Sequence, residues 1–343
     1  MRHSSRRAPV SRVLAAVVLT ASLAACSDAG SSADGQETGS STTAPDAETD
    51  ASTTGSSSDG EFPVTVSGDL GAEPDVEFAS PLDVDETVSE IVIEGDGEPV
   101  ADNTPVLLDL YLANGATGEK LGASFDSGEP VATRLSADLV FPAAYEALVG
   151  QPVGTRVAVV AQPEDGYGPD GMPQLGLEPD QDLVVVVDLL SAAPTEYPRL
   201  PQGERQRVPD LLPSIQTDNG AVTGLDFSTA AAQPPKGLKL YYVVKGDGEP
   251  IEAPRFAAFN YFGQVWGADE PFDQSFDADP LVQPVGLGQF IEGWDTGLIG
   301  VPAGSRVMLV VPPAQGYGAQ GQPSAGIGGD DTMIFVIDVL AVS

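Results

Sequence analysis

The chain repeats itself, and this repeat limits the possible folds more than any other feature of the sequence. Four pairs of motifs recur in the same order: IVIEGDGEPV (91–100) with YVVKGDGEPI (242–251), SFD (124–126) with PFD (271–273), GYG (166–168) with GYG (316–318), and VVVVDLL (184–190) with IFVIDVL (334–340). Most offsets are 150 or 151 residues. A chain of 343 residues is long enough to bury a core in each copy, so we predict two homologous domains.

The first 25 residues have the pattern of a secretory leader. Four arginines precede the apolar run VLAAVVLTASLAA, which is too short for a membrane span, and Cys26 ends the sequence LAAC. LAAC resembles the lipobox of bacterial lipoproteins, in which the cysteine is lipidated. This resemblance implies that Cys26 is lipidated and that the protein is extracytoplasmic, anchored to the cell membrane. The alternative is a plain secretory signal with an incidental cysteine.

Composition divides the rest of the chain. Residues 27–60 are Ser, Thr, Gly, Asp and Glu with almost no large apolar side chains, so they cannot offset the entropy of ordering. Residues 191–209 are rich in proline and read as a semi-stiff linker. We therefore predict five segments: a leader over 1–25, a disordered tether over 26–75, a first domain over 76–190, a linker over 191–209, and a second domain over 210–343.

Charge and residue types exclude several function classes. Removing the leader would leave 11 basic against 51 acidic residues, a net charge of −40, with no histidine and no free thiol. Catalysis by Ser-His-Asp or Cys-His, zinc held by imidazole and a disulfide framework are therefore excluded. The acidity argues against nucleic acid as a partner, since its phosphates would be repelled. No EF-hand spacing is present, and we expect neither a metal nor a cofactor.

Most of each repeat has the pattern of β-strands. VTVSGDL, VLLDLYL, TRVAVV and VVVVDLL are short β-branched runs bounded by Gly, Pro or Asp, and KLYYVV, RVMLVV and IFVIDVL are their later counterparts. One helix interrupts each set, because Ile291, Trp294 and Leu298 recur at i, i+3 and i+7. A mainly antiparallel sheet with one packed helix is an α+β domain.

The second repeat, over about 238–341, resembles an FKBP-type peptidyl-prolyl cis-trans isomerase. The motifs that carry the resemblance are GDG, NYFG, PFDQSF, GQFIEGWDTGLIGVPAGSRV, GYGAQGQP and TMIFVIDVL, in that order. The family's fold is an antiparallel sheet wrapped around a short helix, and its active site is lined by aromatic side chains. The resemblance implies proline-containing polypeptides as clients, and we expect a monomer.

The resemblance also implies a role for each matching residue. Trp294 forms the floor under the proline ring, with Tyr261, Phe272 and Phe335 as walls and Phe290 and Ile291 at the start of the helix. The Ile291 N–H holds a substrate carbonyl, Tyr317 offers a hydroxyl at the rim, Ile327 closes the far loop, and Asp273 is the acid near the twisted amide. Core packing is the alternative for each aromatic residue.

Some positions depart from the family pattern. FDADP lacks the arginine that usually follows the acid, Leu281 replaces an aromatic residue, and Gln322 replaces a frequent histidine. In the first repeat, Ala144 and Val185 replace Trp294 and Phe335, and the strand tyrosine aligns with Leu110 or, one residue away, with Tyr111. Phe125, Asp126 and Tyr167 are interpreted as retained.

Three functions remain open at this point. The first is a lipid-anchored prolyl isomerase that is catalytic in the second domain and assists the folding of extracytoplasmic proteins. The second is a non-catalytic chaperone or adaptor that binds extended peptides. The third is a solute-binding or structural lipoprotein.

Overall fold

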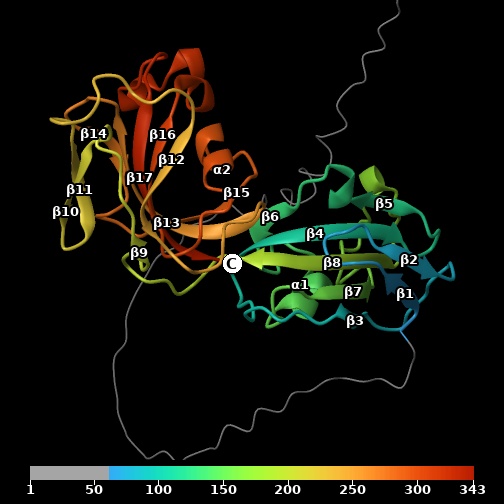
Figure 1. Cartoon of the computed structure of the whole chain (residues 1–343). Coiled ribbons are helices and arrows are strands. Elements are labelled where there is room, and N and C mark those ends of the chain that lie inside the picture. The colour runs from blue at the N-terminus through green and yellow to red at the C-terminus, as the bar shows by residue number, and fades with distance from the viewer. Residues whose placement is uncertain (1–61) are drawn as a thin grey trace, which may run out of the picture.

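The computed structural model describes residues 62–343; the leader, Cys26 and positions 26–61 of the predicted tether lie outside the described residues. The chain forms two domains of the same design, each a mainly antiparallel sheet with one short α-helix (Figure 1). This confirms the predicted α+β architecture. Within residues 62–343, no helix combines the length and apolar character that crossing a membrane requires.

The first domain contains β1 (Val64–Ser67), β2 (Asp75–Phe78), β3 (Val88–Ile93), β4 (Pro105–Asn114), β5 (Lys120–Ala123), β6 (Val131–Arg134), α1 (Pro142–Leu148), β7 (Arg156–Ala161) and β8 (Leu183–Ala192), with short 3-10 helices at Ser124–Asp126 and Pro173–Leu175. Its main sheet has the order β3-β7-β8-β4-β5, and β6 also pairs with β4. All these pairs are antiparallel.

The second domain contains β9 (Glu204–Arg205), β10 (Ser214–Asp218), β11 (Ala221–Asp226), β12 (Lys239–Lys245), β13 (Arg255–Val265), β14 (Pro271–Gln274), β15 (Leu281–Val285), α2 (Glu292–Gly297), β16 (Arg306–Val311) and β17 (Met333–Val342), with 3-10 helices at Pro313–Gln315, Gly318–Gln320 and Pro323–Ala325. Its sheet has the order β14-β13-β17-β16-β12-β9, with β15 also on β13.

The central strands are buried on both faces. Every residue of β7 and β16 is buried, and so is nearly every residue of β8 and β17. On the inner face of the second sheet, Leu309 and Ile337 pack with the helix residues Trp294 and Leu298, while Met308 and Val336 belong to a separate cluster on the outer face. Burial on both faces explains why these strands are continuous apolar runs rather than alternating ones.

A β-hairpin covers the outer face of each sheet. Val64 of the β1–β2 hairpin packs on Val160 and Val184, and Val222 of the β10–β11 hairpin packs in the corresponding cluster of the second domain. The predicted tether boundary at residue 75 is therefore wrong, because the first domain already includes β1. Residues 68–74, which are rich in Gly and acidic side chains, form the turn between β1 and β2 and are not part of a tether.

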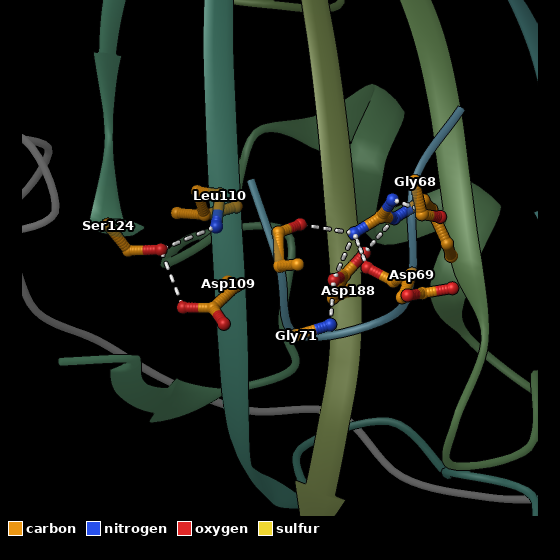
Figure 2. A network of polar contacts seen from close by, with 9 residues as sticks. Gly68, Asp69, Gly71, Asp109, Leu110, Ser124 and Asp188 are labelled. Atoms are coloured by element: carbon orange, nitrogen blue, oxygen red, sulfur yellow. Dashed lines mark hydrogen bonds and ion pairs between the residues drawn. The ribbon is translucent and has the colours of Figure 1, made fainter. Parts of the chain in front are cut away.

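A buried arginine holds each hairpin against its sheet. Arg156 pairs with Asp188, with an Nε–Oδ1 distance of 2.5 Å, and its guanidinium donates to the carbonyls of Gly68, Asp69 and Ala72 at 2.8–3.1 Å. Figure 2 shows Gly68, Asp69 and Gly71 gathered beside Asp188, which also accepts the Gly71 N–H. In the second domain, Arg306 pairs with Asp338 and donates to the Gly220 carbonyl at 2.8 Å.

The predicted linker over 191–209 is shortened at both ends. At its start, β8 continues to Ala192. At its end, the backbone of residues 204–206 pairs with β12 and so belongs to the edge of the second sheet. The two domains also contact each other directly, through Leu107, Ala193 and Phe256. The chain ends at this junction (Figure 1), where the Ser343 hydroxyl donates to the Ala192 carbonyl.

Candidate active site

Trp294 lies on the inner face of the second sheet because α2 approaches the strands closely. Ile291 is the N-cap of α2 and Leu298 its C-cap, so the predicted i, i+3, i+7 face is the buried one. Gly293 and Gly297 make the approach possible, since a Cβ on them would lie 2.6 Å from Val311 and 2.9 Å from Leu309. The indole of Trp294 is 4% exposed.

Trp294 is the centre of a cluster of aromatic rings. Phe290 stacks on it with ring centroids 5.2 Å apart, and three further rings meet it edge to face at 5.4–5.7 Å: Phe259, Tyr261 and Phe335. Phe272 meets Phe335 edge to face at 5.6 Å. Such pairs contribute about 0.5–1.5 kcal/mol each beyond their burial. We call these six residues, Phe259, Tyr261, Phe272, Phe290, Trp294 and Phe335, the aromatic cluster.

Gly263 leaves room for two of these rings. A Cβ at this position on β13 would lie 2.7 Å from Phe272 and 2.9 Å from Phe335. The strand pairing places Gly263 opposite Phe335 on β17 and opposite Asp273 on β14. A side chain here would occupy the space in which the two rings meet.

Tyr261 and Asp273 form the polar edge of the cluster. The Tyr261 hydroxyl donates to Asp273 Oδ2 at 2.6 Å. Burial, and then this hydrogen bond, raise the pKa of Tyr261, so the phenol stays neutral. Asp273 is exposed, and within residues 62–343 it forms no ion pair, in line with the missing arginine. Its remaining hydrogen bond is from the Gln274 N–H at 2.9 Å.

The three remaining predicted site residues surround the cluster. Tyr317 is 39% exposed, and Ile327 is buried in the same core as Trp294. Ile291 is half-buried beside Phe290. Among the described residues, neither the Tyr317 hydroxyl nor the Ile291 N–H has a hydrogen-bond partner, so both are free to donate to a ligand. The structure thus brings seven of the nine predicted site residues into one core and places Asp273 at its edge, and Tyr317 lies near enough to Tyr261 to act on it electrostatically.

Phe259 is a member of the cluster that the motif comparison missed. It is fully buried and lies edge to face with both Trp294 and Phe290. The available signal was its position two residues before Tyr261 on one strand, which places both side chains on the same face.

The strand pairing resolves the uncertain register of the first domain. Tyr261 lies opposite Ile337, and the corresponding residue Val187 lies opposite Leu110. Leu110 is therefore the counterpart of Tyr261, whereas Tyr111 points to the outer face, where Lys120 Nζ lies 5.8 Å from its ring centre. The first domain has no phenol at this position.

The alignment of SFD at 124–126 with PFD at 271–273 is wrong. Ser124 Oγ accepts the Leu110 N–H at 2.9 Å, as Figure 2 shows, and Ser275 Oγ accepts the Tyr261 N–H at the same distance. The counterpart of SFD is therefore Ser275–Asp277, four residues later. By the same register, Leu121 and Gly122 replace Phe272 and Asp273, so Phe125 and Asp126 are not retained site residues.

Tyr167 is retained in sequence but differs from Tyr317 in its contacts. Its hydroxyl donates to the carbonyls of Gln181 and Glu178 at 2.6 and 2.8 Å. This tyrosine therefore holds its own loop, while the equivalent hydroxyl in the second domain is free.

The second-domain site offers apolar surface and free donors. Two buried rings, Phe259 and Phe335, and three half-buried rings surround a nearly buried indole, and an N–H and a phenol lie at the edge. Across residues 62–343, no group of three or more His, Cys, Asp or Glu side chains is arranged to hold a metal ion. Such a site can bind a small apolar ring, exclude water from it and hold a neighbouring carbonyl.

Comparison with known proteins assigns both domains to one family. The family model described as FKBP-type peptidyl-prolyl cis-trans isomerase matches residues 101–190 and 248–340. "FK506-binding protein" of Streptomyces anulatus is 35% identical over 111 residues, covering 32% of this chain and 90% of that protein. "39 kDa FK506-binding nuclear protein" of Drosophila melanogaster is 31% identical over 106 residues, covering 31% of this chain and 29% of that protein. The crystal structure of the three FKBP domains of wheat FKBP73 matches 75% of this chain and 94% of its own, at 17% identity and a TM-score of 0.32.

Proposed function

The chain belongs to the FKBP-type peptidyl-prolyl cis-trans isomerase family, and we propose that its second domain isomerises Xaa-Pro bonds at the aromatic cluster while its first domain does not. The observation that carries this proposal is the aromatic cluster itself. Four rings contact Trp294, and a fifth, Phe272, meets Phe335 in the space left by Gly263. In the first domain the corresponding positions hold Ala144, Leu110, Leu121 and Val185.

The reaction needs no nucleophile. The barrier to rotation about a peptide C–N bond is about 18–20 kcal/mol because resonance gives the bond double-bond character. Water stabilises that resonance by hydrogen-bonding to the polarised carbonyl, so a site that removes the water and holds the bond twisted favours the transition state. The aromatic cluster would take the proline ring, and the free Ile291 N–H and Tyr317 hydroxyl would hold substrate carbonyls.

Asp273 is the one acid at this site, and Tyr261 orients it. The 2.6 Å hydrogen bond uses one carboxylate oxygen, and the Gln274 N–H binds the other. The carboxylate would face the substrate amide as a fixed negative charge, since neither contact is an ion pair. We propose this as its role.

The decisive test removes Trp294 from the intact protein. Trp294→Ala should lower kcat/KM by at least about tenfold, which corresponds to roughly 1.4 kcal/mol of lost transition-state binding. The matched control is Trp266→Ala, the other tryptophan of the chain, which packs on Phe227 outside the aromatic cluster. Its activity should equal that of the unmodified protein. Thermal unfolding checks both variants, because losing a buried aromatic side chain costs about 3–5 kcal/mol of stability.

The same measurements distinguish the isomerase from the competing function, a non-catalytic peptide-binding adaptor. A folded Trp294→Ala protein with full turnover would show that the aromatic cluster is not the catalytic site. A protein that binds prolyl peptides without accelerating their isomerisation would be a peptide-binding adaptor.

We further propose that the protein acts outside the cytoplasm, held on the membrane by a lipid on Cys26. The support is the sequence LAAC after a basic and apolar leader. Cys26→Ala should move the protein from the membrane fraction to the soluble fraction or the medium. Unchanged membrane association of the variant would disprove the anchor and leave the proposed activity of the second domain untouched.

A further inference from the structure

The first domain contains a cavity of about 600 Å³ where the second has its aromatic cluster. Its floor is formed by Leu108, Leu110 and Leu112 of β4, which the strand register equates with Phe259, Tyr261 and Gly263. Ala144, the counterpart of Trp294, is fully buried, and the three leucines form the floor of the cavity in place of an indole. The volume lies in the range of about 300–1,000 Å³ that is typical of ligand-binding pockets.

The walls of this cavity are apolar and its rim is acidic. Leu121, Val140 and Phe141 line its sides, and Leu139, which is 38% exposed, lies at its opening. Three exposed carboxylates also line it: Asp138, Glu164 and Asp170. An apolar group that enters is thus surrounded by negative charge, which favours a ligand with positive charges beside its apolar part.

An edge strand runs along the cavity. Val131 and Thr133 of β6 line it, and in the described part of the chain β6 pairs with β4 alone. The second edge of β6 can accept the backbone of an extended peptide by strand addition, which leaves alternate side chains of that peptide to enter a pocket. These three features select a peptide over a small solute.

We propose that the first domain binds an extended, basic polypeptide segment by inserting one Phe or Trp side chain into this cavity. The leucine floor gives such a side chain an apolar surface, and Lys or Arg residues on either side of it would face the acidic rim. This binding site goes beyond the proposed isomerase activity and does not depend on it, because it uses no residue of the second domain.

The probe is a fluorescein-labelled peptide without proline, which carries one central Phe with Lys on both sides. Its binding to the full chain is measured by fluorescence anisotropy, against the same peptide with central Ala and a third with Glu in place of Lys. Burying a Phe side chain predicts binding about tenfold to hundredfold tighter than that of the Ala peptide. An excess of an uncharged prolyl peptide should not displace the probe.

Two pairs of variants locate the site. Leu110→Trp places a ring inside the cavity and should weaken binding of the Phe peptide by at least about tenfold, whereas Ile91→Trp, at a 47% exposed position on β3, should not. Replacing Asp138 and Asp170 by Lys should weaken binding and its salt dependence, and replacing Asp83 and Glu90 by Lys is the matched control. The charge variants alter exposed residues only, so they decide the matter if Leu110→Trp fails to fold.

Several outcomes would overturn the proposal. Equal binding of the Phe and Ala peptides would show that no side chain enters the cavity. Displacement by the prolyl peptide would place the probe on the aromatic cluster instead. Full affinity in a folded Leu110→Trp protein, or an unchanged response to reversal of the rim charges, would also refute it.

Discussion

Gly263→Ala should impair the aromatic cluster without removing any of its groups. The backbone of Gly263 lies within β13 and has no positive φ, so a methyl group causes no backbone strain. The methyl carbon would instead lie 2.7 Å from Phe272 and 2.9 Å from Phe335. To restore an ordinary contact of 3.4 Å, the rings must move by about 0.7 Å.

Two magnitudes follow from this displacement. Overpacking a well-packed core costs about 1–3 kcal/mol, so the protein should remain folded with a lower free energy of unfolding. A misplacement of about 1 Å in a catalytic site can cost about a hundredfold in rate, so we expect kcat/KM to fall by about tenfold to hundredfold. Exchange NMR of an Xaa-Pro peptide measures turnover without a coupling protease, and urea unfolding measures stability.

Two further variants separate the steric effect from a general one. Gly224→Ala changes a strand glycine whose nearest contact is the flexible side chain of Gln216 at 3.0 Å, and its turnover should be unchanged. Combining Gly263→Ala with Phe272→Leu should recover stability but not activity, because the steric conflict is relieved by removing a wall. If a folded Gly263→Ala protein kept full kcat/KM, Phe272 and Phe335 would not contact the reacting proline.

Two other predictions concern stability. Arg306→Leu leaves the fully buried Asp338 carboxylate without its cation and should lower the free energy of unfolding by about 3–5 kcal/mol. Arg205→Leu, on the exposed strand β9, should change it little. Urea titration measures both variants, and equal stability of the two would show that the Arg306–Asp338 pair does not hold the β10–β11 hairpin. Burial raises the folded-state pKa of Tyr261 above the value of about 10 in the unfolded chain, so the unfolded state loses its proton first and stability should fall as the pH rises above about 10. Tyr261→Phe should flatten that decline between pH 9 and 11, and an unchanged slope would show that Tyr261 does not cause it.

The residues that gather around Trp294 in the second domain were largely predictable from the sequence. Trp294, Tyr261, Phe272 and Phe335 each lie within a motif of several residues, and the order of these motifs is preserved. Phe259 could not be found in this way, because its role is to pack beneath Trp294 and a buried aromatic residue on a strand carries no separate signal.

The counterpart positions in the first domain were harder to predict. Matching SFD to PFD relied on two identical residues, whereas the true register is set by backbone pairing with β4 and by the Ser124 hydrogen bond. The second repeat contains both PFD at 271–273 and SFD at 275–277, so a match of two residues does not show which of them corresponds to SFD at 124–126. Only pairing across the sheet shows that Leu121 and Gly122 occupy the positions of Phe272 and Asp273.

The first hairpin was assigned to the tether because its turn, SGDLGAEP, resembles a tether in composition, although VTVSGDL was predicted as a strand; neither hairpin was predicted to cover its sheet. The informative signal lay elsewhere, in VVVVDLL and IFVIDVL. A strand with one exposed face would alternate polar and apolar residues, so these continuous runs already required a cover on the second face.

The buried Arg–Asp pairs also couple each hairpin to the centre of its sheet. Arg156 of β7 and Asp188 of β8 bind the turn between β1 and β2, and Arg306 of β16, paired with Asp338 of β17, binds the turn between β10 and β11. Detaching a hairpin would leave a buried ion pair without these backbone partners, which is costly. We therefore expect each hairpin to open only when its sheet opens, so that the backbone amides of hairpin and sheet exchange hydrogen together.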